Sequence, residues 1–286
     1  YNYKKIILKI KDFLIIKANW NPKYKNILSL QKKLGLSVEN SFFIDDSNFE
    51  IDSVNTMLPK IDTQNYIEFK NFHKNIDKIL ISENHKITKE DKTRNKLYSE
   101  EFKRSNEKDK YSNFNNYIKN LDIILDIKKN SSKDVSRISQ LTQRTNQFNS
   151  SAIKLNELDI KKIIKDQKKT IYQCSARDKF GDYGIIGLAI IELKNQTATI
   201  TNFLMSCRAL GREIENYFFK YFVKEIKKSG ISKTIILFKK NDKNFLVSQF
   251  LKKNCKKTTA NKRLTYYEVN MLNKPIDGKL IKINEK

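Results

Sequence analysis

The chain has little glycine, proline, cysteine or histidine. Its 286 residues include 7 Gly, 3 Pro, 3 Cys and 2 His. Cys174, Cys207 and Cys255 are too few and too widely spaced for a disulfide framework or a structural zinc site, even with two imidazoles. We therefore expect reduced thiols and a cytoplasmic location.

A long apolar run is also missing. No stretch approaches the ~18 apolar residues that a membrane-spanning helix needs, and the N-terminus lacks the features of a signal peptide. Hydrophobic residues make up 39% of the chain, which is adequate for packed cores. We expect a globular protein with no membrane partner, long enough for two domains or for one with a large appendage.

Positive charge is abundant. The 57 Lys and Arg residues outnumber the 32 Asp and Glu residues, which gives a formal charge of +25. Such a balance ordinarily indicates a polyanion partner. Here Lys is spread along the whole chain together with Asn and Ile, as an AT-rich coding sequence would produce. We expect no nucleic-acid partner, and a non-enzymatic polyanion-binding module is kept as an alternative.

Two adjacent carboxylates follow an apolar run in SFFIDDSNFE. Asp45 and Asp46 stand at the end of an expected buried parallel strand, with a helix after them, which is how open α/β sheets build their sites. Like charges this close favour a bound cation, and Mg²⁺ takes carboxylate and phosphate oxygens. Lys23, after Pro22 at a helix start, would add a charge for the phosphate. The alternative is that Asp46 and Ser47 only cap the next helix.

The remaining chain reads as a charged segment followed by alternating strands and helices. Residues 85–111 are strongly charged and favour helix over a disordered connector. Gly181 and Gly184 supply the backbone angles of a tight turn. The expected elements are a strand at 121–127, a helix at 135–148, three strands within 168–206, a helix at 211–230, a strand at 233–238, a helix at 245–254 and a strand at 263–271.

A glycine turn follows the third of those consecutive strands. In FLMSCRALGRE, Arg208, Gly211 and Arg212 form R-x-x-G-R between a strand and an amphipathic helix. Cys207 precedes them, and the two arginines with the helix N-terminus favour a thiolate that acts as a nucleophile. No His lies in this half of the chain to assist it. The alternative is that Cys207 is a small buried residue that fills space.

Five segments together resemble FkbH-like proteins, in which a haloacid-dehalogenase (HAD) superfamily domain is joined to a GNAT-like acyltransferase domain. The segments are ANWNPKYKNI, SFFIDDSNFE, LTQRTNQFN, RDKFGDYGIIG and FLMSCRALGRE. The R-x-x-G-R turn resembles the GNAT loop R/Q-x-x-G-x-G/A, whose N–H groups cradle the phosphate-bearing arm of an acyl donor. Glu213 stands where that loop ends in a small residue, which places a carboxylate close to the expected phosphate.

The resemblance implies an α/β fold with several parts. Residues 1–85 would be the C-terminal part of a HAD-like (Rossmannoid) domain with a partial parallel sheet, and residues 86–118 a charged helical connector. Residues 119–272 would be a GNAT-like α+β domain with a mixed sheet, followed by a tail at 273–286. The HAD nucleophile motif, DxDxT, is missing upstream of Lys17. We expect an N-terminally truncated chain, or one whose phosphate chemistry has been lost.

Roles for individual residues also follow from the resemblance. Lys23, or less readily Lys17, would contact phosphate. Asp45 would act in catalysis and would bind Mg²⁺ together with Asp46. Cys207 would be the catalytic thiol. The residues implied to bind the acyl group and pantetheine are Arg208, Gly211, Arg212, Asn146, Gln147 and Asn149; for the three amides, helix capping and surface polarity are the alternative.

The activity implied by the resemblance is acyl transfer with dephosphorylation. FkbH-like proteins take a glyceryl group from 1,3-bisphosphoglycerate and load the three-carbon unit onto the phosphopantetheine thiol of an acyl carrier protein, in pathways such as polyketide biosynthesis. The implied cofactors are Mg²⁺ and the phosphopantetheine of a carrier protein or CoA, and the implied partner is an acidic carrier protein. A CoA-dependent GNAT N-acyltransferase is the main alternative.

Overall fold

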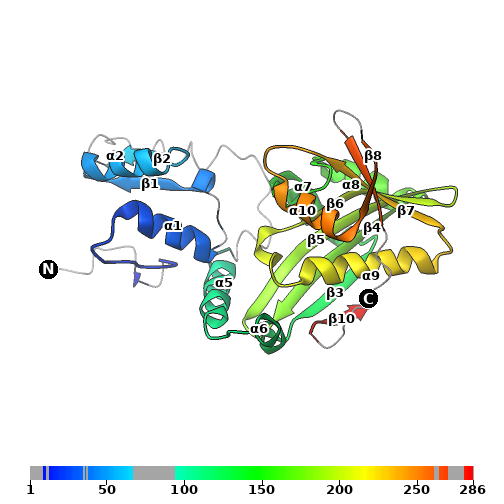
Figure 1. Cartoon of the computed structure of the whole chain (residues 1–286), viewed down its shortest axis with the longest axis horizontal. Helices are drawn as coiled ribbons and strands as arrows, with labels where there is room; N and C mark the ends of the chain where they lie inside the picture. Colours follow the sequence, from blue (N-terminus) through cyan, green and yellow to red (C-terminus); the bar gives the residue numbers. More distant parts are fainter. Residues whose placement is uncertain are drawn as a thin grey trace. The chain divides into compact units, whose positions relative to one another are not determined.

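The computed structural model describes residues 9–10, 13–34, 36, 38–66, 94–260, 264–269 and 280–285. The chain divides into two compact units, Tyr1–Asn106 and Glu107–Lys286 (Figure 1). Residues 1–8 and 67–93, where the sequence predicts the start and end of the HAD-like part and the start of the connector, lie outside the described residues.

The first unit contains a short β-α-β arrangement. Its elements are α1 (Lys23–Leu34), η3 (Val38–Asn40), β1 (Phe42–Asp45), α2 (Asn48–Met57) and β2 (Asp62–Asn65). The strands pair in parallel, and a small cluster of Val54, Leu58 and Ile61 forms the core. The predicted strand and the helix after it are both present. Because β1 has one strand neighbour in the described part of this unit, it is only partly buried, and a larger HAD-like sheet is not shown.

The charged segment is helical where the structure describes it. α5 spans Arg94–Lys108. One face of this charged helix is buried. The side chain of Arg104 is shielded from solvent, and its guanidinium lies 3.8 Å from a carboxylate oxygen of Glu100 and 3.7 Å from one of Glu101. A buried cation of this kind is tolerated when carboxylates are close to it.

The second unit is built on an eight-stranded mixed sheet with the strand order β10-β3-β4-β5-β6-β7-β9-β8. Strands β3 to β6 are antiparallel neighbours, whereas β6 with β7 and β10 with β3 are parallel. The elements in chain order are α6 (Phe114–Leu121), β3 (Ile124–Lys129), η4 (Ser132–Asp134), α7 (Val135–Arg144), α8 (Glu157–Lys165), β4 (Lys169–Asp178), β5 (Gly181–Lys194), β6 (Thr197–Met205), η5 (Cys207–Ala209), α9 (Ile214–Lys228), β7 (Lys233–Lys239), α10 (Phe245–Asn254), β8 (Lys256–Ala260), β9 (Leu264–Glu268) and β10 (Lys282–Glu285).

Helices cover both faces of this sheet (Figure 1). Alternate strand residues point to opposite faces, so Ala189 packs with α6, α9 and α10 while its neighbour Ile190 packs with α7 and α8. On the α9 side, the ring of Phe203 lies 5.3 Å from that of Phe219 and 5.5 Å from that of Phe222. The F-F-x-x-F pattern of α9 therefore forms its buried stripe.

The mixed sheet agrees with the α/β class expected from the sequence, but the limits of the unit differ from 119–272. The unit begins at Glu107, because Tyr117, Ile118 and Leu121 of α6 belong to the main core. It also includes part of the expected tail, since β10 pairs in parallel with β3. The strand predicted at 121–127 begins only at Ile124, and α8, β8 and β10 were not predicted.

Candidate functional site

Strands β6 and β7 separate halfway along their length. They pair in parallel only where residues 197–200 lie opposite residues 233–236. Beyond that point β6 continues to Met205 and β7 to Lys239. The second halves of the two strands therefore turn backbone N–H and C=O groups toward a gap in the sheet, and such groups must find other partners when buried.

A β-bulge lies where the separation begins. Ile191 is opposite Ile200, but Ile190 is opposite Asn202, so Thr201 is an extra residue on β6. Its Oγ1 donates to the backbone oxygen of Ile190 at 3.2 Å. A bulge increases the local twist and bends the strand, which accounts for the departure of β6 from β7.

The chain between α7 and α8 lies in this gap. The backbone N–H of Ser150 donates to Phe203 O at 2.9 Å, and that of Met205 donates to Phe148 O at 2.9 Å. On the other side, the N–H of Lys239 donates to Ser150 O at 2.8 Å. The N–H of Phe203 donates to Ser150 Oγ at 2.9 Å. Residues 148–150 thus act as a very short strand between β6 and β7.

Asn149 is placed at the centre of that short strand, opposite Leu204. It is fully buried; its Nδ2 donates to Thr145 O at 3.1 Å, and its Oδ1 accepts from Ala152 N at 2.9 Å. Asn244 Nδ2 donates to Asn149 O at 3.1 Å and so ties the segment to the start of α10. These contacts show a positioning role for Asn149, and its acyl-binding role remains a proposal.

The other two amides of the motif are on the surface. Asn146 and Gln147 are exposed, and Asn146 Oδ1 accepts from Lys154 Nζ at 3.1 Å. Burial lowers the pKa of Lys154 below its usual value. The structure therefore separates these side chains from the buried carboxamide of Asn149, and their part in an acyl pocket stays a proposal.

The glycine turn occupies the predicted place between β6 and α9. Gly211 has φ +73°, and a Cβ there would meet no atom within 4 Å, so glycine is favoured by the backbone angle rather than by crowding. Glu213 also has a positive φ, 64°, and its Oε2 accepts from Asn216 Nδ2 at 2.7 Å. A non-glycine residue in this region costs on the order of 1 kcal/mol, and the side-chain contact offsets part of it.

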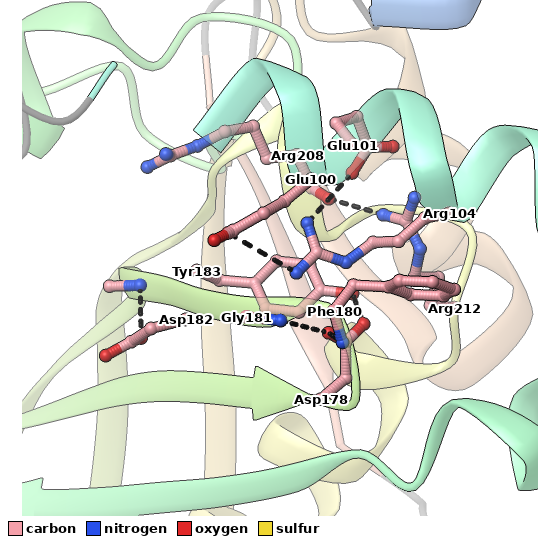
Figure 2. Close-up of polar contacts among 11 residues, drawn as sticks. Glu100, Glu101, Arg104, Asp178, Phe180, Gly181, Asp182, Tyr183, Arg208 and Arg212 are labelled. Carbon is pink, nitrogen blue, oxygen red and sulfur yellow. Dashed lines mark hydrogen bonds and ion pairs between the residues drawn. The ribbon is translucent and has the colours of Figure 1, made fainter. Parts of the chain in front are cut away.

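Arg212 points into the protein and braces the turn. It is 7% exposed, and its Nη1 donates to Arg208 O at 2.5 Å. Its guanidinium lies 5.8 Å from the ring centroid of Tyr183, whose hydroxyl donates to Asp178 Oδ2 at 2.7 Å (Figure 2). Arg212 thus links the glycine turn to the turn between β4 and β5.

The turn between β4 and β5 is held by its two aspartates. Asp178 Oδ1 accepts from the N–H groups of Phe180 at 2.9 Å and Gly181 at 3.1 Å (Figure 2). Asp182 Oδ1 accepts from Gly184 N at 2.7 Å, and Gly184 has φ +67°. These are the local side-chain to backbone bonds that stabilise Asp-rich turns.

Glu215, in the first turn of α9, was not singled out from the sequence. Its Oε1 accepts from Gly211 N at 3.4 Å, while its Oε2 is shielded from solvent and has no hydrogen-bond partner among the described residues. Burial raises the pKa of this carboxyl group, the charge of Glu213 raises it further, and Arg212 opposes both. A carboxylate at a helix N-terminus was the available signal. Glu215 lies next to the Gly211 turn, to which the resemblance assigns the donor phosphate.

The three cysteines have different environments. Cys207 is exposed at the start of η5, so the space-filling alternative does not hold for it. Cys174 is fully buried in β4, and burial raises the pKa of its thiol. Burial also raises the pKa of Cys255, to about 12. The thiol available to reagents and substrates is therefore that of Cys207, and its catalytic role remains a proposal.

In the first unit, the structure brings Lys23 and Asp45 together. Lys23 Nζ lies 3.7 Å from Asp45 Oδ2, and Asp45 Oδ1 accepts from Ser47 N at 3.0 Å. Ser47 caps α2, because its Oγ accepts from Glu50 N at 3.4 Å. Ser47 is therefore the N-cap of α2, and in the described structure Asp46 makes no side-chain contact that caps this helix.

A magnesium site here would depend on two carboxylates. No group of three or more His, Cys, Asp or Glu side chains suited to a metal occurs in the parts of the chain that are described. Mg²⁺ needs only one or two protein carboxylates when water and phosphate complete its shell, so Asp45 and Asp46 fit in chemical type. Lys23 lies beside Asp45, and both Lys23 and Lys17 are exposed, so a phosphate contact of either lysine stays a proposal. Magnesium binding stays a proposal.

Across the described residues, no helix combines the length and apolar character needed to cross a membrane.

Comparison with known proteins gives a likeness of fold. No family model and no curated protein matches the chain. The ribosomal-protein-S18-alanine N-acetyltransferase from Escherichia coli is similar over 54% of this chain and 97% of its own, with 10% identity and a TM-score of 0.40. The match to the PaiA N-acetyltransferase from Thermoplasma acidophilum, in complex with coenzyme A, covers 51% of this chain and 98% of that protein, with 14% identity and a TM-score of 0.37. The match to the GNAT domain of S. lividans PAT covers 50% of this chain and 88% of that domain, with 9% identity and a TM-score of 0.39.

The likeness to these structures covers about half of this chain, at 9–14% identity. They do not show the HAD-like domain, the magnesium ion or the acyl carrier protein that the resemblance to FkbH-like proteins implied. Those features, and the reaction itself, have to be judged from the residues of the site.

Cysteine reactivity should follow these environments. With iodoacetamide at pH 7.5, we expect Cys207 to be modified first, because raising the pKa of Cys255 from 9.0 to about 12 lowers its thiolate fraction roughly a thousandfold. Peptide mass spectrometry would locate the label, and Cys207→Ser should abolish the fast phase. Labelling of Cys174 at the rate of Cys207 in folded protein would contradict the described burial.

The carboxyl of Glu215 should make stability depend on pH. Its folded pKa lies above the unfolded value near 4.5, so the folded state binds the proton more tightly. The free energy of unfolding should therefore fall as pH rises from 4.5 through the raised pKa. Glu215→Gln should lose this dependence and stabilise the protein more at pH 8 than at pH 4, as measured by urea denaturation.

A matched variant separates this effect from the general loss of a carboxylate on α9. Glu225 lies on the same helix and pairs with Lys228 on the surface, with 2.7 Å between Oε1 and Nζ. Glu225→Gln should not reproduce the stabilisation at high pH. If both variants change stability equally at every pH, the carboxyl of Glu215 is not disfavoured by its surroundings.

Proposed function

We propose that the Glu107–Lys286 unit is a CoA-dependent acyltransferase that moves an acyl group from the CoA thioester to an amine. The observation that carries this proposal is the separation of β6 from β7 at the Thr201 bulge, with the Arg208–Gly211 turn and the N-terminus of α9 directly after β6. Residues 148–150 fill the gap beside Phe203 and Met205, so a reacting group would approach the end of β6 from the glycine turn. The turn supplies N–H groups and a cation for phosphate oxygens.

The chemistry asks little of the protein. The amine nitrogen attacks the thioester carbonyl, the C–N bond forms, the C–S bond breaks, and the amine gives up a proton while CoA leaves as a thiolate that is reprotonated. The chain must position the donor. Glu215 lies at the turn that is proposed to bind the phosphates, so it is distant from the thioester end of the donor, and the amine proton passes to water.

Arg208 is the cation proposed to meet the donor phosphates. It is half-buried in η5 at the edge of the turn, whereas Arg212 is buried and stacked on Tyr183. The two arginines of the motif therefore have separate tasks. Arg208 binds phosphate, and Arg212 keeps the turn in shape.

A second function is favoured by two specific observations. The carboxyl of Glu215 lies at the turn where a CoA pyrophosphate would come close. The thiol of Cys207, which precedes the same turn, is exposed. Both suit the FkbH-like reaction. The Cys207 thiolate would attack an acyl phosphate such as 1,3-bisphosphoglycerate and release phosphate, then pass the acyl group from its thioester to the phosphopantetheine thiol of an acyl carrier protein. Within the first unit, Asp45, Asp46 and Lys23 would form a separate site for Mg²⁺ and phosphate.

One experiment separates the two functions. Acetyl-CoA binding is measured by calorimetry, and transfer by release of free CoA thiol with a panel of amines. We expect wild-type protein to bind, and Arg208→Ala to weaken binding by about tenfold, the equivalent of one charge-assisted phosphate contact. Lys233→Ala removes the same charge from an exposed residue at the opposite end of the β6–β7 pair and should leave binding unchanged.

The opposite result would support the second function. Wild-type protein that ignores acetyl-CoA, but gains an acyl adduct from Mg²⁺ and acetyl phosphate in intact-mass spectra, would contradict the CoA proposal. That adduct should disappear in Cys207→Ala and be discharged by a holo acyl carrier protein.

A further inference from the structure

A buried carboxamide in β6 has no hydrogen-bond partner. Asn202 is 1% exposed, and neither its Oδ1 nor its Nδ2 bonds to any described residue. Leaving such groups unpaired costs about 1–3 kcal/mol for each, and buried amides in folded proteins are normally satisfied. An apolar side chain at this position would serve stability better, so the carboxamide calls for another explanation.

The bulge determines the face to which Asn202 points. Ile200 and Phe203 both belong to the core on the α9 side, because the extra residue Thr201 interrupts the alternation. Asn202 therefore shares the opposite face with Leu204, which packs in the α7–α8 cluster. Its partner across β5 is Ile190, also in that cluster. The carboxamide is thus a polar group in an apolar layer.

A second buried polar group without a partner follows the short strand. Asn149 pairs in antiparallel with Leu204, and extension of that register by two residues gives Ser151 as the residue across from Asn202. Ser151 is 2% exposed, and its Oγ has no hydrogen-bond partner in the described structure. Its neighbour Ser150, by contrast, uses its Oγ to accept from Phe203 N.

Both groups lie at the mouth of the strand gap. Ile200 is the last residue of β6 that pairs with β7, so Asn202 is on the first part of β6 beyond the separation. One carboxamide and one hydroxyl in apolar surroundings make a small site for an uncharged group that has both a hydrogen-bond donor and an acceptor.

We propose that Asn202 and Ser151 select the acyl group of the donor, favouring a short acyl chain with a hydroxyl or amide substituent over a plain alkyl chain. The inference rests on the acyl-transfer function proposed above and adds its specificity. Asn202 Nδ2 donates to the substituent oxygen and Oδ1 accepts from its O–H or N–H, while Ser151 Oγ provides a further contact. A site built to bond a hydroxyl rejects the analogue without it, because its own groups are then left unpaired.

The test compares lactoyl-CoA with propionyl-CoA, which differ by one hydroxyl. We expect wild-type kcat/KM to favour lactoyl-CoA by about tenfold or more. Asn202→Leu, which keeps the branching of the side chain but removes its polar atoms, should remove this preference by slowing the lactoyl reaction while preserving the propionyl reaction, and Ser151→Ala should reduce it. Thr199→Val, which removes a partly buried hydroxyl from β6 before the strands separate, is the matched control and should keep the preference. An unchanged preference in Asn202→Leu would overturn the proposal and leave the pair with a bound water.

A binding measurement keeps this inference separate from the reaction. If neither thioester is turned over, the acyl-transfer function fails, but the site is still tested by the side-chain amide resonances of Asn202, assigned by their loss in Asn202→Leu. Methyl lactate should shift them, and methyl propionate, which lacks the hydroxyl and has no hydrogen-bond donor, should not. Equal shifts with both probes, or none with either, would overturn the proposal.

Discussion

The hydrogen bonds that residues 148–150 make in the gap between β6 and β7 hold the candidate site together. Phe203 and Met205 lie in the middle of an eight-stranded sheet, yet β7 has already left them. Without the bonds to Phe148 and Ser150, their backbone groups would be buried and unpaired, at about 1–3 kcal/mol for each group. The connection between α7 and α8 is therefore part of the sheet. The length of this connection and its register with β6 determine which residues line the gap.

That arrangement limits how a substrate approaches. The edge of β6 at Phe203 is already bonded to Ser150, so a donor arm cannot pair with the backbone at that residue while Ser150 stays in place. Contacts remain available at the glycine turn, where Arg208 is half-buried and Cys207 exposed. Arg212 and Glu215 have inward roles there, one bracing the turn and the other placing a carboxyl against Gly211. The carboxyl groups of Glu213 and Glu215 make the turn more acidic than a plain phosphate cradle. This acidity opposes the binding of a CoA pyrophosphate and so favours the second proposed function, transfer to an acyl carrier protein.

Local sequence patterns predicted most helices and strands but not the contacts between segments that are distant in the sequence. The apolar runs of β4 to β6, the positive φ of Gly184 and Gly211, and α9 and α10 follow from periodicity and turn chemistry. Ser150, Glu215 and Asn202 were missed, because their roles arise from a bulge and from register between distant segments. Asn202 carried one signal, a polar residue within the apolar run ITNFLM. β10 was missed because its pairing partner β3 lies over 150 residues away in the sequence.

The most direct measurement is hydrogen exchange at the backbone amides of Phe203 and Met205, followed by NMR in the full chain. Both amides donate within the gap, to Ser150 Oγ and to Phe148 O. The account predicts that they exchange as slowly as the amides of β5, and that Ser150→Gly speeds exchange at Phe203 while leaving β5 protected. Fast exchange at both amides in the wild-type protein would mean that residues 148–150 do not close the gap, and would contradict the site described here.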